Sequence, residues 1–230
     1  VNISGHTHSP LQDPRSIWQG EFTVIETGSL SYGCLFFKPQ SVNQITDLIP
    51  YGHDAVGCSF AEVYADRLVL RRYTLSDGME IAPENPLVMP LPHDPSHPKY
   101  GIKERTATET PPEFPANVEP AVWFDYGFVY LLFDPAIDTS SVFGYNVAIT
   151  DDKGVCRDYF HLSDYYRPFA HRANRVCFRF PPNSVMSGRK YRLEVRPVGF
   201  FGSRGRAFDM DVHIRDGYPC NNTIPVLPVE

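Results

Sequence analysis

Short apolar segments that recur along the second half of the chain set the strongest limit on its fold. From Pro111 onward they follow one another at intervals of about ten residues, with turn-forming residues between them. Segments of this length and spacing predict a β-sandwich, in which two sheets bury their apolar faces against each other. The expected strands are residues 121–124, 130–133, 144–149, 176–180, 191–198 and 207–214.

The expected strand at residues 191–198 shows the clearest alternation. Its odd-numbered residues up to Val195 are apolar, and its even-numbered residues up to Arg196 are charged. Since successive side chains of a strand point to opposite faces, we expect the first set in the core and the second in solvent. This strand and the last one resemble the F and G strands of a fibronectin type III domain, with Tyr191 in the position of the tyrosine corner. The resemblance covers residues 111–218 and implies an architecture rather than an activity.

A proline-rich stretch, residues 83–110, precedes the expected sandwich. Repeated prolines remove backbone donors and fix φ, so they disfavour a continuous helix or sheet ladder. We therefore expect this stretch to be an extended, semi-rigid linker. His93 and His97 lie inside it and could both ligate a metal ion, but the prolines prevent the helical turn that would align them. A solvated linker is the favoured interpretation.

The motif Gly5-His6-Thr7-His8 lies close to the first residue of the chain. It follows a short β-prone segment, residues 1–4, so its two imidazoles can reach from a strand end toward a common point. Neutral imidazole nitrogens are suited to a transition metal. A catalytic metal centre needs more ligands than two histidines, and nothing precedes the motif that could supply them. We therefore expect the chain to be the C-terminal fragment of an enzyme.

The motif and the segments after it resemble the closing part of the calcineurin-like metallophosphoesterases. Gly-His-x-His is the last metal-binding motif of that family, and a strand and a Gly-Ser turn follow it. Here residues 22–27 and Gly28-Ser29 take those places, and a hairpin expected at residues 57–75 resembles the terminal hairpin of the same fold. The resemblance covers residues 1–92. It implies the incomplete C-terminal sheet portion of an α/β metallophosphoesterase fold.

Other motifs of the family are missing from this sequence. Asp-x-His, Gly-Asp and Gly-Asn-His precede Gly-His-x-His in the family and are not found ahead of it here. The one Asp-x-His match, Asp211-Val212-His213, lies in a late expected strand and in the wrong order. The resemblance therefore assigns no metal role to these residues.

For the site, the resemblance implies a pair of metal ions. His6 would bind the second metal and His8 the first, and Mn, Fe or Zn would suit imidazoles mixed with carboxylates. Two such ions in the full-length protein would share a water or hydroxide and promote hydrolysis of phosphate mono- or diesters. The chain alone lacks a bridging carboxylate, so we expect it to hold no metal and to be inactive.

Arg15 and Trp18 follow in what should be the same loop region. As speculative substrate-binding residues, Arg15 would pair with a phosphate oxygen and Trp18 would stack on an organic group. The alternative is a surface salt bridge and a packed aromatic ring, and the sequence favours neither. Asp13-Pro14 is typical of a turn rather than of a catalytic acid.

Composition argues against two classes of partner. The net charge is −6 and the pI is about 5.7, whereas nucleic-acid binding requires clustered Lys and Arg. No apolar stretch approaches the roughly 18 to 20 residues that cross a bilayer. The 5 cysteines form no Cys-x-x-Cys pair, which argues against a zinc ribbon. Cys156 and Cys177 fall in one expected domain and could be bridged, although buried free thiols are favoured.

The sequence thus predicts a mainly β chain that forms the C-terminal part of a metal-dependent phosphoesterase. Its expected parts are a metallophosphoesterase segment (1–82), the linker (83–110), the fibronectin-like sandwich (111–218) and a tail (219–230). The alternative is a noncatalytic β-sandwich that binds a partner through exposed aromatic residues. The candidates are Tyr165, Tyr166, Phe200 and Phe201, although a half-buried position in the core is the favoured interpretation of each.

The N-terminal sheet would be uncovered in a fragment that starts at Val1, so we expect it to self-associate or to bind a missing upstream portion. The sequence does not determine the cellular compartment. Periplasmic and secreted locations both fit a fragment whose signal peptide would lie upstream.

Overall fold

The structure is a computed structural model of the whole chain, and it divides into two compact units. The first unit comprises residues 1–109 with 166–170, and the second comprises residues 110–165 with 171–230. The division after Glu109 falls close to the expected start of the sandwich. The residues that the structure describes are 1–5, 10–30, 34–35, 47–48, 56–96, 98–125, 127–137, 142–167, 172–181 and 184–214. The predicted tail therefore lies outside the described residues.

Small sheets make up the described part of the first unit. Their strand orders are β1-β3-β2, β4-β5 and β6-β7-β8. In the first of these sheets β1 runs parallel to β3, and β2 runs antiparallel to it. The bounds are β1 (Asn2–Ser4), β2 (Ile17–Gln19), β3 (Thr23–Glu26), β4 (Cys34–Leu35), β5 (Asp47–Leu48), β6 (Gly57–Val63), β7 (Arg67–Thr74) and β8 (Leu87–Pro90).

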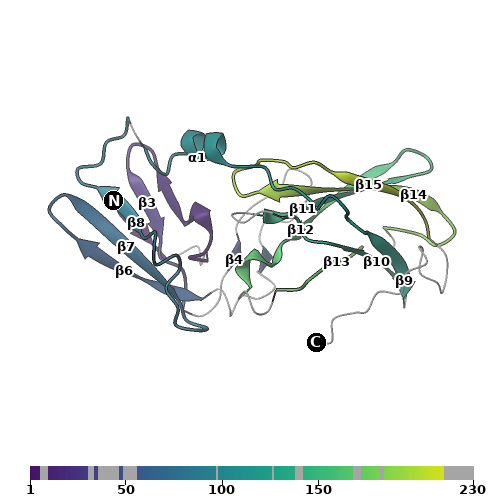
Figure 1. Cartoon of the computed structure of the whole chain (residues 1–230), viewed down its shortest axis with the longest axis horizontal. Helices are drawn as coiled ribbons and strands as arrows, with labels where there is room; N and C mark the ends of the chain where they lie inside the picture. Colours follow the sequence, from purple (N-terminus) through teal and green to yellow (C-terminus); the bar gives the residue numbers. More distant parts are fainter. Residues whose placement is uncertain are drawn as a thin grey trace. The chain divides into compact units, whose positions relative to one another are not determined.

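The predicted hairpin of the first unit is confirmed. β6 and β7 pair antiparallel from Gly57 opposite Thr74 to Val63 opposite Leu68. Figure 1 shows the two strands side by side with β8 on the far side of β7. The hairpin is thus part of a larger sheet, in which β7 is the central strand, rather than an isolated terminal element.

The stretch 83–110 is not an extended linker along its length, because it contributes a strand and a helix to the first unit. β8 pairs with β7, and the helix α1 spans Ile102–Thr108. Pro90 is compatible with the ladder because it ends a strand at the edge of its sheet, where a backbone donor is not needed. Leu87 and Met89 are buried, so burial of the apolar face of β8 outweighs the weakening of sheet pairing by Pro90 and the prolines around the strand.

One apolar cluster joins two sheets of the first unit. It takes side chains from β2 and β3 and from β7 and β8, together with an aromatic ring that precedes α1. Its buried members are Ile17, Ile25, Leu68, Leu70, Leu87, Met89 and Tyr100.

The second unit is a β-sandwich in its described part (Figure 1). One sheet has the order β13-β10-β9 and the other has the order β12-β11-β14-β15. Neighbouring strands in both sheets are antiparallel. The bounds are β9 (Ala121–Asp125), β10 (Phe128–Phe133), β11 (Val142–Asp151), β12 (Cys156–Leu162), β13 (Val176–Arg179), β14 (Lys190–Gly199) and β15 (Phe208–His213).

The two sheets share a single apolar core. The aromatic rings of Phe133 and Tyr145 meet in it edge to face, with centroids 5.0 Å apart. Burial raises the pKa of Tyr145 to about 12. The buried members are Val122, Val129, Leu131, Phe133, Tyr145, Val147, Ile149, Phe178, Phe180, Val185, Tyr191, Leu193, Val195, Val212 and Ile214.

Each strand predicted for the sandwich is present, with ends that differ by a few residues. The alternation predicted for β14 is also confirmed, since Tyr191, Leu193 and Val195 are buried while Arg192 and Glu194 are exposed. The strand that was not predicted is β12. It carries polar residues at its beginning, and its sequence alone gives no clean alternation. The mainly β fold class is confirmed. No helix among the described residues has both the length and the apolar character needed to span a membrane.

Candidate functional site

The predicted metal motif begins at the carboxyl end of β1. Ser4 ends this strand, and its carbonyl oxygen accepts a hydrogen bond of 2.8 Å from the backbone N–H of Thr27, which follows β3. A Cβ atom on Gly5 would lie 3.0 Å from the Thr27 Oγ1. The glycine of the motif therefore lies where two parallel strands end and where a larger residue would be crowded.

The predicted metal ligands His6 and His8 lie outside the described residues. Within the part that is described, no group of three or more His, Cys, Asp or Glu side chains could hold a metal ion. This finding does not extend to His6 and His8, whose role as metal ligands stays a prediction.

The chain that follows the motif is anchored by a buried leucine and by an arginine from another sheet. We call residues 10–17 the flanking segment. Leu11 is buried, and its carbonyl oxygen accepts a hydrogen bond of 2.9 Å from the Nη1 atom of Arg72. Arg72 belongs to β7 and is itself buried. This contact connects the flanking segment to the central strand of the β6-β7-β8 sheet.

Asp13 organises the flanking segment by capping a short turn. Its Oδ1 atom accepts the backbone N–H of Arg15 at 2.8 Å, at the start of the 3-10 turn Pro14–Ser16. Proline suits the beginning of such a turn because the donor that it lacks would have no partner there. The prediction that Asp13-Pro14 initiates a turn is confirmed.

The same carboxylate binds the Arg15 side chain through two hydrogen bonds. Arg15 Nε lies 2.9 Å from Asp13 Oδ1, and Arg15 Nη2 lies 2.6 Å from Asp13 Oδ2. Burial acts to lower the pKa of Arg15, but the hydrogen bonds and charge of Asp13 outweigh it and raise that pKa. A phosphate group would have to compete with Asp13 for this guanidinium. Substrate binding by Arg15 stays a prediction.

Tyr166 completes the surroundings of this carboxylate. Its hydroxyl donates a hydrogen bond of 2.7 Å to Asp13 Oδ2, and it accepts a longer one of 3.5 Å from Arg15 Nη2. Tyr166 is 2% exposed and belongs to the segment 166–170 that is part of the first unit. The buried carboxylate is therefore satisfied by a charged partner, a backbone N–H and a phenol, as burial of a charge requires.

Arg105 of α1 holds the other end of the flanking segment. Its Nη1 atom donates to the carbonyl oxygens of Pro14 at 2.5 Å and Ile17 at 2.8 Å. Its Cζ atom lies 5.6 Å from the ring centroid of Trp18 and 5.0 Å from that of Tyr100, within cation–π range. Burial lowers the pKa of Arg105 to about 10, so the side chain is still a cation at neutral pH. Trp18 thus contacts an arginine of its own unit, and its stacking on a substrate stays a prediction.

The residues that hold the flanking segment were not found by sequence reasoning. Arg72, Arg105 and Tyr166 are separated from it by 61, 91 and 153 positions. No local motif contains them, and the sequence indicates for Tyr166 only a half-buried core position or an exposed aromatic one, without a partner. A charged residue next to an apolar strand is common, so nothing in the sequence distinguishes Arg72 from a solvated arginine.

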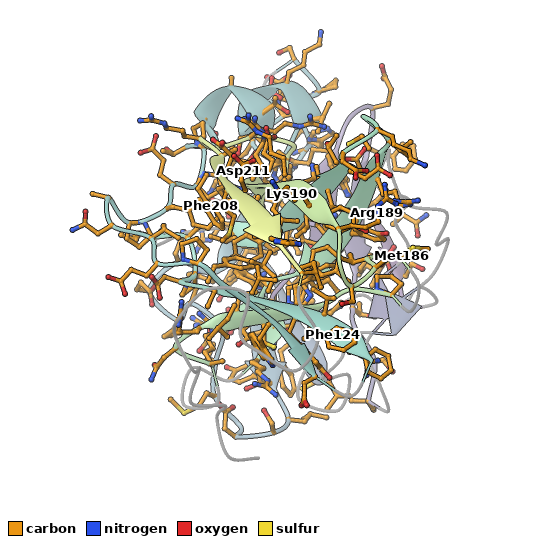
Figure 2. The ribbon with its side chains drawn as sticks, turned by 90° about the vertical axis from the view of Figure 1, so that its right-hand side faces the viewer. Phe124, Met186, Arg189, Lys190, Phe208 and Asp211 are labelled. Atoms are coloured by element: carbon orange, nitrogen blue, oxygen red, sulfur yellow. The ribbon has the colours of Figure 1, made fainter. Side chains whose placement is uncertain are left out.

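A groove of about 460 Å³ is the second candidate site, and it lies in the second unit. It is lined by the end of β11 and by the facing parts of β14 and β15. Figure 2 labels Lys190 and Asp211 at this place, with Arg189 at the turn before β14. The lining residues are Thr150, Asp151, Asp152, Lys190, Tyr191, Arg192, Asp211, Val212 and His213.

Ion pairs and a capped turn fix one wall of this groove. Asp151 Oδ1 accepts the backbone N–H groups of Val155 at 2.8 Å and Lys153 at 3.0 Å, and its Oδ2 lies 3.2 Å from Arg189 Nη2. These bonds, that from Val155 foremost, lower the pKa of Asp151. Arg189 also pairs with Asp152. The groove combines carboxylates with basic side chains, which suits a polar ligand of no strong net charge.

The two cysteines of the sandwich are free and exposed, so the suggested disulfide does not form. The favoured interpretation of buried thiols is also wrong. Cys156 belongs to β12 and Cys177 to β13, and these strands lie in different sheets. Both residues are exposed, so they lie on the outer faces of a sandwich whose sheets are about 10 Å apart, too far for a bridge. Of the four aromatic candidates, Tyr166 and Phe200 are buried, which agrees with the favoured core position, so these two do not form an exposed aromatic surface.

Comparisons with known proteins add no family assignment. No protein-family model matches the chain, and no curated protein matches it.

Proposed function

We propose that the chain supplies the closing histidine pair of a metal-dependent phosphoesterase. The single observation that carries the proposal is the position of Gly5-His6-Thr7-His8, which starts at the carboxyl end of β1 beside the parallel strand β3. Ligands often bind just beyond the carboxyl ends of parallel strands, where residues such as these lie. In this proposal His8 would bind the first metal ion and His6 the second.

The chemistry would depend on two divalent ions of Mn, Fe or Zn. Bound together, such ions supply an activated water and stabilise charge on the attacked phosphoester. Two histidines alone do not make a dinuclear centre, so further ligands, carboxylates among them, would have to complete it. The contribution of this chain would be two neutral nitrogen ligands, with Arg15 and Trp18 as candidate contacts for the substrate.

The proposal treats the second unit as a fibronectin type III-like domain. The strand orders β9-β10-β13 and β12-β11-β14-β15 support it, because they describe a sandwich of three and four strands. The Tyr191 hydroxyl also accepts the backbone N–H of Met186 at 2.9 Å, which is the backward contact expected of a tyrosine corner. This part of the proposal concerns architecture and assigns no catalytic role to the second unit.

The test uses the full-length product of the gene, loaded in turn with Mn²⁺ and Zn²⁺. Hydrolysis of p-nitrophenyl phosphate and bis(p-nitrophenyl) phosphate would be measured for the wild type and a His6→Ala/His8→Ala variant. We expect the variant to lose most of its activity and part of its bound metal. A His213→Ala variant is the matched control. Full activity in the double variant would overturn the assigned roles.

Self-association through the first unit is a second part of the proposal. Val1 directly before β1 and Ile3 within it are more than half exposed, and among the described strands β1 lies at the edge of the β1-β3-β2 sheet. An uncovered edge with apolar side chains is a site where another strand can pair. Light scattering on the 230-residue chain should show dimers or larger species that a charged Ile3→Lys variant reduces. A monomer at all concentrations would contradict this part.

The alternative function is that of a noncatalytic binding module, and the groove of the second unit is the observation in its favour. A polar ligand bound there would contact Lys190, Asp211 and His213. Ligand screening with the intact chain and with a Lys190→Ala/Asp211→Ala variant would test it. Binding that survives both substitutions would exclude the groove.

A further inference from the structure

We propose that the strand β6 pairs with β6 of a second copy of this chain, so that two three-stranded sheets join into one. The proposal requires neither a metal ion nor the exposed edge of β1. Among the described strands, β6 is an outer strand of the β6-β7-β8 sheet, and Figure 1 shows it beside β7. It is 7 residues long and pairs with β7 without a shift in register.

Alternate residues of β6 direct their backbone groups away from β7. At the end of the hairpin, the backbone N–H of Tyr64 donates to the carbonyl oxygen of Arg67 at 2.8 Å. Residues that bond to the partner strand alternate with residues that do not along an antiparallel pair. The even-numbered residues of β6 therefore bond to β7, and the odd-numbered residues turn their N–H and carbonyl groups to the open edge.

One end of this edge is already occupied. The backbone N–H of Gly57 donates to the carbonyl oxygen of Ser29 at 3.0 Å, which agrees with the outward direction of the odd-numbered residues. Within the described part of the chain, no hydrogen bond reaches the outward groups of Ser59, Ala61 and Val63. The free edge is thus a row of three residues with Ala61 at its centre.

The side chains of β6 leave this edge accessible. Phe60 is 61% exposed, Val63 is 72% exposed, and Ala61 is exposed as well. Natural sheets protect an edge strand with lysine, proline or a β-bulge. The residues of β6, all of which the structure describes, include neither lysine nor proline, and the pairing with β7 has no bulge. An accessible edge of this kind favours the addition of another strand.

An antiparallel pair of two β6 strands uses every free group when its two-fold axis lies at Ala61. Ala61 then faces the partner's Ala61, and each Ser59 faces a Val63 of the other copy. Each of these three pairs exchanges two backbone hydrogen bonds. A register centred on Phe60 would instead place Val63 opposite the partner's Gly57, whose N–H is already bound. The register at Ala61 is therefore the favoured one.

The same register suits the side chains of the exposed face. Glu62 is the one charged residue of β6, and it would face the partner's Phe60 rather than a second carboxylate. Arg71 lies opposite Phe60 on β7, so the partner's Arg71 would follow in the same row of the joined sheet. Like charges directly opposite each other, which destabilise a sheet, are avoided. A single pair of short strands makes a small interface, so we expect a weak and reversible dimer.

The experiment measures amide hydrogen exchange in the intact chain at protein concentrations from about 10 μM to about 1 mM, the range of weak affinities. We expect exchange at Ser59, Ala61 and Val63 to slow as the concentration rises. Exchange at Phe60 and Glu62 should depend little on concentration, because their N–H groups are already bonded to β7. Sedimentation velocity on the same samples gives the dissociation constant of the dimer.

Two substitutions at the two-fold axis test the pairing. Ala61→Pro removes the outward N–H but no bond to β7, and proline is tolerated on an edge strand. Ala61→Lys keeps every backbone group and places two cations opposite each other. Each should weaken the dimer about 5-fold or more, through lost hydrogen bonds or through like charges. Ala61→Val is the matched control, because it keeps the N–H and adds no charge, and urea midpoints verify that all three variants are folded.

Each outcome decides for or against the pairing of β6. Concentration-dependent protection of the three outward amides, with weaker dimers in Ala61→Pro and Ala61→Lys but not in Ala61→Val, supports it. A monomer at about 1 mM, the weak end of measurable affinities, overturns it. Dimers that Ile3→Lys weakens and Ala61→Lys leaves unchanged also overturn it, since they would form through β1. Protection of these amides at every concentration would show that the same chain covers the edge, and this result too contradicts the proposal.

Discussion

Tyr166 and Asp13 are separated by 153 positions in the sequence, yet the Tyr166 hydroxyl lies 2.7 Å from Asp13 Oδ2. The carboxylate between this phenol and Arg15 is 3% exposed. A buried carboxylate is stable only when its oxygen atoms are bonded, and here each of them accepts at least two donors. Asp13 is therefore bound both by Arg15 within the flanking segment and by Tyr166 outside it.

An Asp13→Asn substitution should destabilise the first unit. Asparagine keeps the size of the side chain but removes the charge that faces the Arg15 guanidinium. It also replaces one accepting oxygen with an NH₂ group, which cannot accept the hydrogen bonds that Arg15 and Tyr166 donate to this carboxylate. We expect a loss of about 2 kcal/mol in the free energy of unfolding, in the range of hydrogen bonds to charged groups. Urea unfolding followed by tryptophan fluorescence measures it, since Trp18 is in this unit.

The matched control for this substitution is Asp66→Asn. Asp66 also pairs with a neighbouring arginine, but its side chain is 72% exposed, so the loss should be at most about 1 kcal/mol. If both variants lost the same free energy of unfolding, burial of Asp13 would not strengthen its interaction with Arg15.

A Tyr191→Phe substitution should weaken the sandwich without changing its fold. The phenylalanine ring keeps the apolar contacts of Tyr191 in the core, but the backbone N–H of Met186 loses its acceptor at 2.9 Å. The expected loss is about 1 kcal/mol of stability. Calorimetry or urea unfolding of the chain would record it as a lower midpoint for the second unit.

Tyr130→Phe serves as the control in the same unit. Tyr130 stacks on Trp123 with centroids 5.0 Å apart, and within the described part of the chain its hydroxyl makes no hydrogen bond. A loss as large as that of Tyr191→Phe would rule out the corner hydrogen bond as the cause.

A Gly205→Ala substitution should disturb the second unit through overpacking. A Cβ atom at this position would overlap the carbonyl oxygen of Pro112, and it would lie 2.8 Å from Pro197 Cγ. Because the atom in the way belongs to the backbone of Pro112, the backbone segments at Gly205 and Pro112 would have to move apart. The expected cost is about 1–3 kcal/mol, measured as a shift of the thermal unfolding midpoint.

Gly20→Ala provides the comparison, since no atom lies within 4 Å of the Cβ that it would add. We expect this variant to unfold as the wild type does. If Gly205→Ala also left the unfolding midpoint unchanged, the overlap with Pro112 would be relieved without a loss of stability, and the overpacking argument would be wrong.

His161 should make the sandwich less stable in mild acid. Its ring packs edge to face on Phe178 at 5.7 Å, and loss of hydration lowers its pKa, while the charge of Asp164 acts in the opposite direction. In the unfolded chain its pKa is near the ordinary value of about 6.5. The unfolded state therefore binds a proton at a pH where the folded state does not, so stability falls as the pH drops below about 6.5 and continues to fall until the lowered pKa is passed.

A His161→Leu variant removes this titrating group. Urea midpoints of the second unit between pH 7.5 and 5 should then decline less steeply than those of the wild type. Asp164 and every other titrating group are present in both proteins, so the difference between the two slopes belongs to residue 161. Parallel slopes would show that His161 takes up its proton without cost in the folded state.

Much of the sandwich could be predicted from local patterns. Alternation along β14 identifies a half-buried strand, because residues on one face of a sheet recur with a period of two. β12 escaped detection because its first residues are polar on both faces. β8 was not predicted because the prolines in and around it argue against a strand, and the burial of Leu87 and Met89 depends on a partner strand that no local pattern identifies.

The candidate site was likewise predictable only in its local features. The sequence by itself determined the sandwich strands with clear apolar alternation, the turn at Asp13-Pro14 and the presence of a His-x-His motif after a strand, because each of these depends on neighbours within a few residues. Only the tertiary structure decided that Arg72, Arg105 and Tyr166 converge on the flanking segment. The physical reason is that burying a charge or a backbone carbonyl requires a partner in space, and nothing in a local pattern states which distant residue folding will bring there.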